Sequence, residues 1–121
     1  MLKNFIFVGL GGAVGSMLRY AVTLLATAMQ ISTNWATVAV NVVGSFLIGL
    51  FLSMCGTGSW MLLLTVGLCG GFTTFSTFSS QSLTLLQNGQ YGAGLAYVFG
   101  TLVLCLLFVW CGMALGARIS E

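Results

Sequence analysis

Long apolar stretches separated by short polar connections run along the whole chain. A helix needs about 20 mostly apolar residues to cross the hydrocarbon core of a membrane. Four segments meet this requirement, at about 4–28, 35–54, 60–86 and 91–117. The connections between them, 30–34, 55–59 and 88–90, contain no charged residue. The pattern predicts an all-α integral membrane protein with four transmembrane helices in one domain, 1–121. We expect the first segment to be a retained span rather than a cleaved signal peptide.

Charge is scarce, which excludes a water-soluble domain. The only charged side chains are Lys3, Arg19, Arg118 and Glu121, whereas about a quarter of an average soluble chain is charged. Four spans place both termini on one side of the membrane, and Lys3 and Arg118 favour the cytoplasm. No loop charge reinforces this bias, so the chain could insert in either orientation.

The side chains available for chemistry are few. The chain has no His, and its only carboxylate side chain is Glu121. This inventory excludes paired-carboxylate catalysis, a Ser-His-Asp triad and a histidine metal site, so we do not expect an enzyme. The four cysteines, Cys55, Cys69, Cys105 and Cys111, form no CxxC pair, and we expect them to be small buried apolar residues.

The third apolar segment is interrupted by polar residues. Gly70-Gly71-Phe72 is followed, through Ser82, by eight hydroxyl or amide side chains broken only by Phe75 and Phe78. Irregular polar backbone at membrane depth survives where it lines a cavity or packs on protein, and a glycine-interrupted span is a pointer to an ion or substrate site. We expect a break at Gly70–Gly71. It would free carbonyls that suit a monovalent cation and N–H groups that suit an anion.

Two other spans carry possible hydrogen-bond donors. Thr37 and Asn41 lie four residues apart and share one helix face. Tyr97, Thr101 and Cys105 form a polar stripe along the last span. Asn41 either cross-links helices or donates to a passing ion, and Thr101 either bonds to its own helix or faces a pathway.

Phe75 and Phe78 lie three residues apart, which is typical of packing as well as of a site. Thr74, Thr77, Ser79 and Gln81 surround them. An aromatic ring has a positive edge, so a pair presented edge-on can attract a small anion. No span contains an acidic residue or a His that could carry protons. This absence favours passive passage of a small hydrogen-bond-accepting ion over proton-coupled pumping.

Two features of the first span concern packing and charge. Gly11 and Gly15 have the spacing that lets helix backbones approach closely, and Gly112 and Gly116 repeat it in the last span. Arg19 follows in the same apolar stretch. Its charge either reaches to the membrane interface or faces a water-filled vestibule that concentrates anions.

Taken together, these motifs resemble the CrcB/Fluc family of fluoride channels over essentially the whole length. The resemblance is carried by Gly11-Gly12-Ala13-Val14-Gly15 with Leu18-Arg19-Tyr20, by Val40-Asn41 with Gly44 and Gly49, and most specifically by Gly67-Leu68-Cys69-Gly70-Gly71-Phe72-Thr73-Thr74-Phe75-Ser76-Thr77-Phe78-Ser79. It implies an antiparallel, dual-topology homodimer in the cell (inner or plasma) membrane, with two pores that export fluoride passively and confer fluoride resistance. The expected partners are fluoride, a second copy of the chain and the lipid bilayer, with no nucleic acid.

The resemblance also implies roles for individual residues. A structural Na⁺ at the dimer interface would be held by the backbone carbonyls of Gly70 and Thr73. The fluoride pathway would comprise Thr37, Asn41, Thr74, Phe75, Phe78, Ser79, Gln81, Tyr97, Thr101 and Cys105, with Arg19 in the vestibule. Gln81 stands where a Glu is expected and Cys105 where a Ser is usual. A thiol is the weaker donor.

Two other functions fit parts of the pattern. A small multidrug exporter is also a four-helix dual-topology dimer, but it works through a glutamate within the membrane, and no span here contains a carboxylate. A structural subunit without transport would fit the glycine-rich faces, but it leaves the hydroxyl-rich segment 73–82 without a purpose.

Overall fold

Four long helical segments account for nearly the whole protein. The computed structural model describes residues 1–54 and 56–120, so the expectations for Cys55 and Glu121 lie outside the described residues. Its helices are α1 (Leu2–Ala28), α2 (Thr33–Ser53), α3 (Ser59–Leu62), the π-helix η1 (Leu63–Cys69), α4 (Gly70–Phe72), α5 (Phe75–Gln87) and α6 (Tyr91–Ile119). In this part of the chain, four segments are long and apolar enough to span a membrane: Leu2–Ala28, Thr33–Ser53, Ser59–Gln87 and Tyr91–Ile119. The predicted all-α fold with four spans is confirmed.

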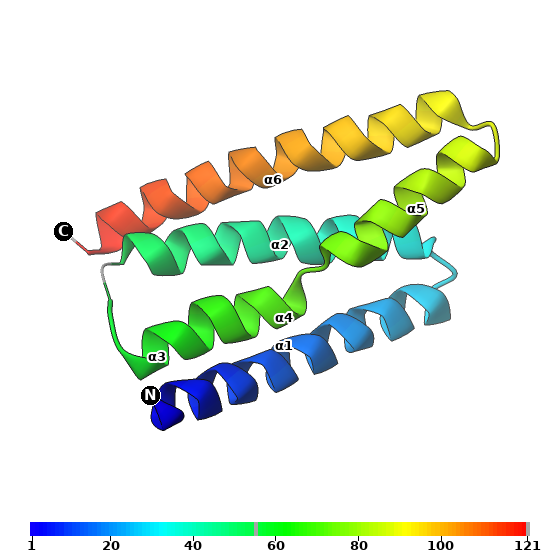
Figure 1. Cartoon of the computed structure of the whole chain (residues 1–121). Helices are drawn as coiled ribbons and strands as arrows, with labels where there is room; N and C mark the ends of the chain where they lie inside the picture. The colour runs from blue at the N-terminus through cyan, green and yellow to red at the C-terminus, as the bar shows by residue number, and fades with distance from the viewer. Residues whose placement is uncertain (55, 121) are drawn as a thin grey trace.

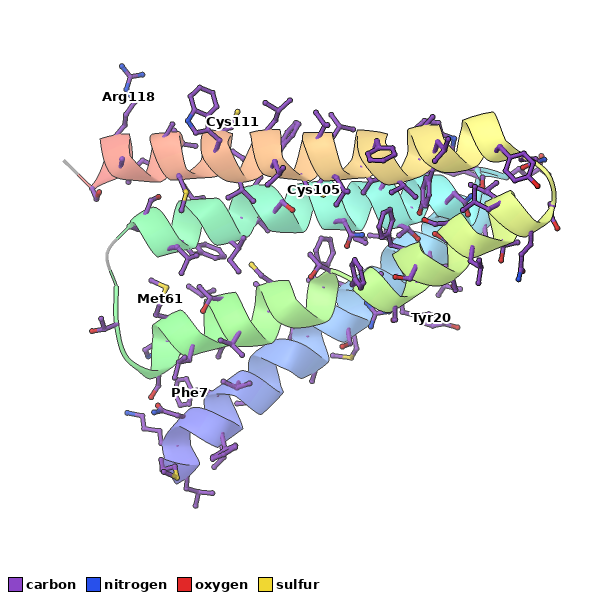
Figure 2. The ribbon with its side chains drawn as sticks, turned by 45° about the horizontal axis from the view of Figure 1, so that its top comes forward. Phe7, Tyr20, Met61, Cys105, Cys111 and Arg118 are labelled. Atoms are coloured by element: carbon purple, nitrogen blue, oxygen red, sulfur yellow. The ribbon has the colours of Figure 1, made fainter. Side chains whose placement is uncertain are left out.

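The helices form an open arrangement rather than a closed bundle. In Figure 1, α6 and α1 lie at opposite edges, with α2 and the α3–α4 run between them, and α5 turns away to lie beside α6. Both termini lie at the same end of the molecule, as four crossings require. Figure 2 shows Phe7 of α1 beside the start of α3, where its ring packs edge-on against Trp60 with the centroids 5.1 Å apart.

Small residues make the helix contacts. The backbone at Gly11 and Gly15 lies directly against η1, so that a Cβ at Gly15 would collide with the Leu68 carbonyl. On the other side of the molecule, a Cβ at Gly112 would collide with the Phe46 carbonyl of α2. The close packing predicted from the two glycine pairs is confirmed, because backbone atoms occupy the space that a side chain would need.

The core of one protomer is correspondingly thin. Among the described residues, no large side chain is fully buried. The buried apolar residues are Ala26, Ala36, Val40, Cys69 and Phe78. Large apolar side chains are instead exposed along every long helix. Exposure of this kind suits lipid or a second protein surface rather than water.

The third span combines two departures from regular α-helix. Residues 63–69 form a π-helix, a wide turn that is rare and usually short. The helix then ends at Phe72, and Thr73 and Thr74 are extended, with ψ angles of 161° and 117°. The predicted break is therefore present, but its predicted position at Gly70–Gly71 is wrong. Both glycines remain in α4, and Gly71 serves close packing, since a Cβ there would lie 2.6 Å from the Gly12 carbonyl oxygen.

Candidate functional site

The extended pair Thr73–Thr74 forms the centre of the site. The Thr73 amide and hydroxyl both donate to the Cys69 carbonyl, at 3.1 and 2.9 Å. Thr74 is the N-cap of α5, and its hydroxyl accepts a hydrogen bond from the Thr77 amide at 3.2 Å. Side-chain oxygen at this position satisfies a backbone donor that has no helical partner. The threonines thus end one half of the span and begin the other.

Asn41 of α2 holds this pair in place. Its Nδ2 donates to the Thr74 carbonyl at 3.0 Å, and its Oδ1 accepts from the Thr74 amide at 2.8 Å. The side-chain amide therefore takes both backbone hydrogen bonds of an extended residue, as a neighbouring strand would. Of the two alternatives for Asn41, the structure bears out the first, a hydrogen-bonded link between helices, here between α2 and the third span. The second hydrogen on Nδ2 takes no part in these two bonds.

The aromatic side chains follow in a row from the break toward α6. The ring centroids of Phe75 and Phe78 are 5.8 Å apart, and those of Phe78 and Tyr97 are 5.4 Å apart. Phe78 is only 6% exposed, whereas Phe75 is 75% exposed. Phe78 is thus packed within the protomer, while the outer face of Phe75 is left open.

Gln81 and Tyr97 continue the row as a hydrogen-bonded pair. The Tyr97 hydroxyl donates to Gln81 Oε1 at 2.6 Å. Thr37 is buried and donates to the Thr33 carbonyl at 3.2 Å. The structure therefore brings Gln81 and Tyr97 together, while the Thr37 hydroxyl bonds to its own helix. It does not bring in Ser79, which lies on an exposed face of α5.

A groove of about 310 Å³ gathers most of the predicted residues at one place. It lies where α2, the break and α6 meet. Its lining includes Asn41, Cys69, Gly70, Thr73, Thr74, Phe75, Phe78, Thr101 and Cys105. Sequence reasoning missed five of the lining residues, Gly44, Ser45, Ile48, Cys69 and Leu102. Gly44 could have been suspected from its place one turn after Asn41, and the Thr73 methyl group packs directly on it.

A second hollow of about 380 Å³ adjoins the first. Tyr97 and Thr101 are part of its lining, and Thr101 lines both. The predicted stripe on the last span therefore runs from one hollow to the other, with Cys105 in the first, Tyr97 in the second and Thr101 shared.

Thr101 has an unusual environment. Its side chain is 5% exposed, and its hydroxyl oxygen has no hydrogen-bond partner within residues 1–54 and 56–120. The alternative that Thr101 bonds to its own helix is therefore wrong, although Thr37, Thr65 and Ser82 all do so. A buried hydroxyl without a partner costs about 1–3 kcal/mol. Its place on the groove wall gives it the capacity to bind a ligand there.

Arg19 takes a position that neither alternative described. Its Nε donates to the Gly71 carbonyl at 3.0 Å, across 52 residues of sequence. Gly71 lies in the last turn of the α3–α4 run, where carbonyls lack helical partners. Arg19 thus caps the first half of the broken span. The sequence held a signal for this, because Gly11, Gly15 and Arg19 are each four residues apart on one face of α1.

The backbone oxygens predicted to hold Na⁺ fit that purpose. Gly70 and Thr73 both line the groove. Of the carbonyls near the break, those of Cys69, Gly71 and Thr74 accept hydrogen bonds. No hydrogen bond of the described residues reaches the Gly70 or Thr73 carbonyl. Two carbonyl oxygens without a hydrogen bond, on residues that line the groove, are suitable ligands for a hard cation.

Comparison with known proteins gives a consistent result. Residues 6–113 match the family described as "CrcB-like protein, Camphor Resistance (CrcB)". The chain is 44% identical to the "Fluoride-specific ion channel FluC" of Phocaeicola vulgatus, covering 99% of this chain and 100% of the relative. Proteins with the same description from Rhodospirillum rubrum and Thermus thermophilus are 42% and 44% identical, each alignment covering 98% of both chains.

Proposed function

The chain belongs to the CrcB family, a family of ion channels rather than enzymes, and from this premise we propose that it is a fluoride-selective channel. It is a multi-pass membrane protein with four spans in its described part. The observation that carries the proposal is the buried, unpartnered Thr101 hydroxyl in a groove shared with Asn41 and Cys105. This groove offers hydrogen-bond donors to an ion that accepts hydrogen bonds strongly.

The proposed selectivity follows from the chemistry of the groove. Fluoride is small and strongly hydrated, so a pore must replace its water with donors at close range, as cation filters do with carbonyls. The Thr101 hydroxyl and the free N–H of Asn41 supply donors, and the ring edges of Phe75 and Phe78 bridge the apolar gap. Tyr97 lies along the pathway with its hydroxyl hydrogen donated to Gln81. Larger halides are rejected because they fit the width poorly and lose donor contacts.

We further propose that two copies of the chain assemble as an antiparallel homodimer with two pores. Polar groups at membrane depth need a protein or aqueous surface over them, and a groove containing Asn41 and the break lies open on one face of the protomer. A second copy would cover it and the exposed face of Phe75. With Lys3, Arg19 and Arg118 as the only basic residues, the chain has little preference for one orientation.

The proposed Na⁺ would sit at this interface on the carbonyls of Gly70 and Thr73. When bound, it supplies positive charge that neutralises the carbonyl dipoles. We propose that fluoride moves passively, from the cytoplasm outward across the inner membrane, and so confers fluoride resistance. The spans contain no acid or His that could couple the movement to protons.

The test is ion efflux from liposomes containing the purified protein, followed with a fluoride electrode and with a matched chloride trial. Fluoride efflux without chloride efflux is expected. Efflux of neither ion from folded dimeric protein would contradict the channel proposal, and equal efflux of both would contradict selectivity.

The aromatic row gives a second test. We expect Phe75→Ile and Phe78→Ile each to abolish fluoride efflux, because an aliphatic side chain has no positive ring edge. Phe99→Ile is the matched control, since Phe99 is 61% exposed on α6 and lies outside both hollows. Normal efflux in both Phe75→Ile and Phe78→Ile would refute the aromatic role.

A further inference from the structure

Arg19 belongs to the face of α1 that meets the third span. Gly11 and Gly15 bring the α1 backbone against η1, and a Cβ at Gly15 would lie 2.8 Å from the Phe72 amide nitrogen. Arg19 follows one turn later on the same face. This close approach is what allows the half-buried Arg19 side chain to reach the Gly71 carbonyl, at 3.0 Å. The contact therefore depends on the glycines that precede it.

The contact lies at the point where the first half of the span ends. The carbonyls in the last turn of a helix have no helical donors and carry the negative end of its dipole. Arg19 supplies both an N–H and a positive charge there. Asn41 of α2 fixes Thr74, three residues after Gly71, through two hydrogen bonds. The break is thus held between a donor on α1 and an amide on α2.

We propose that Arg19 is a positioning residue for the conduction pathway, acting through its Nε–H···O=C bond to Gly71 rather than as a charge that attracts anions. By engaging the Gly71 carbonyl, it fixes the 71–72 peptide plane and restrains the neighbouring plane that carries the Gly70 carbonyl. Asn41 holds the 73–74 plane, which carries the Thr73 carbonyl, through the Thr74 amide. The inference rests on the proposed fluoride channel for its consequence in transport, but the positioning itself is tested without transport.

Three substitutions at Arg19 distinguish the effect of its Nε–H donor from the effect of its positive charge. In Arg19→Gln, the amide nitrogen occupies the same place along the side chain as the arginine Nε, so the donor is kept and the charge is lost. In Arg19→Lys, the charge is kept, but a methylene replaces the Nε donor. Arg19→Met keeps neither. A positioning role predicts that Gln preserves the break and that Lys and Met do not, whereas an electrostatic role predicts that Lys is the better replacement.

The first readout is hydrogen exchange of the backbone amides in peptides covering 70–77, on purified dimer. We expect exchange in Arg19→Gln to stay within about threefold of the original protein, and to rise about tenfold in Arg19→Lys and Arg19→Met, as for loss of one charge-assisted hydrogen bond. Protection by Lys but not by Gln would overturn the proposal, and so would unchanged exchange in all three variants. This readout does not depend on whether the protein conducts fluoride.

The second readout is fluoride efflux at low and high ionic strength. Arg19→Gln should retain most of the efflux, and Arg19→Lys should lose about tenfold at both salt concentrations. A vestibule charge predicts instead a loss in Arg19→Gln that shrinks as salt screens the charge, and that result would overturn the proposal. Arg118→Gln, at the exposed end of α6 away from the groove (Figure 2), controls for removal of one positive charge.

Discussion

The two halves of the third span use opposite ways of packing. The first half, Ser59–Phe72, lies against α1 through glycines and buries backbone against backbone. Thr65 there donates to its own helix, at the Met61 carbonyl. The second half, Phe75–Gln87, faces α6 and presents aromatic and amide side chains to it. The first half fixes the position of the span against α1, and the second half carries Phe75 and Phe78, which line the groove.

The difference shows why a broken helix is useful here. A continuous helix would keep the glycine face and the aromatic face in one fixed relation to α1. The two extended residues at the break let the second half leave α1 and cross toward α6, as Figure 1 shows. The first half, Ser59–Phe72 (the anchored half), can then pack closely on α1 with apolar residues. The second half, Phe75–Gln87 (the displayed half), can keep its polar side chains. Changes in each half should therefore have different consequences.

The largest effect is expected from filling the contact in the anchored half. Gly15→Val places a side chain where the Leu68 carbonyl lies, and the two helices can make room for it only by losing their close backbone contact. We expect a loss of about 3 kcal/mol or more, enough to remove most folded protein. The measurement is the yield of monodisperse dimer and its unfolding in denaturing detergent. Gly9→Val is the matched control, because nothing lies within 4 Å of a Cβ there. Equal loss in both variants would contradict the anchoring role.

A smaller effect is expected at the junction of the two halves. Asn41→Ala leaves the amide and the carbonyl of Thr74 without partners, at a cost of about 2 kcal/mol. Asn41→Asp should keep the acceptor for the Thr74 amide and lose the donor to its carbonyl. Unfolding in denaturing detergent and fluoride efflux are measured together. If efflux fell while unfolding did not change, Asn41 would serve the ion and not the junction.

Much of this arrangement could be predicted from the sequence alone. The four spans follow from apolar length, the glycine contacts from spacing, and most of the groove residues from the polar stripe and the segment after Gly71. The position of the break could not be predicted, because Gly70 and Gly71 suit both a broken helix and a close contact with α1. Only the neighbouring helix decides between the two, and it is some 50 residues away in the chain.

The other features of the structure that the sequence did not predict have similar causes. The contact between Arg19 and Gly71 joins distant parts of the sequence, and the π-helix 63–69 has no periodic signal of its own. Ser79 carries a hydroxyl of the kind expected along the pathway. On a helix that begins at Phe75, however, it lies about 100° around from Phe78 and so leaves the face that meets α6. The proposed dimer, Na⁺ site and fluoride pathway remain predictions.

The smallest effect concerns the displayed half and the groove it completes. Cys105 lines the groove beside Thr101, and a thiol donates hydrogen bonds more weakly than a hydroxyl. Cys105→Ser should therefore raise fluoride efflux by about two- to threefold, less than the full value of one hydrogen bond, and leave unfolding unchanged. Cys111→Ser is the matched control, because Cys111 is exposed on the outer side of α6 (Figure 2). An equal rise of fluoride efflux in both variants would mean that the effect of Cys105→Ser does not depend on its place in the groove. Unchanged efflux in Cys105→Ser would mean that the ion passes Cys105 without accepting a hydrogen bond, which would confine the donors of the pathway to Asn41 and Thr101.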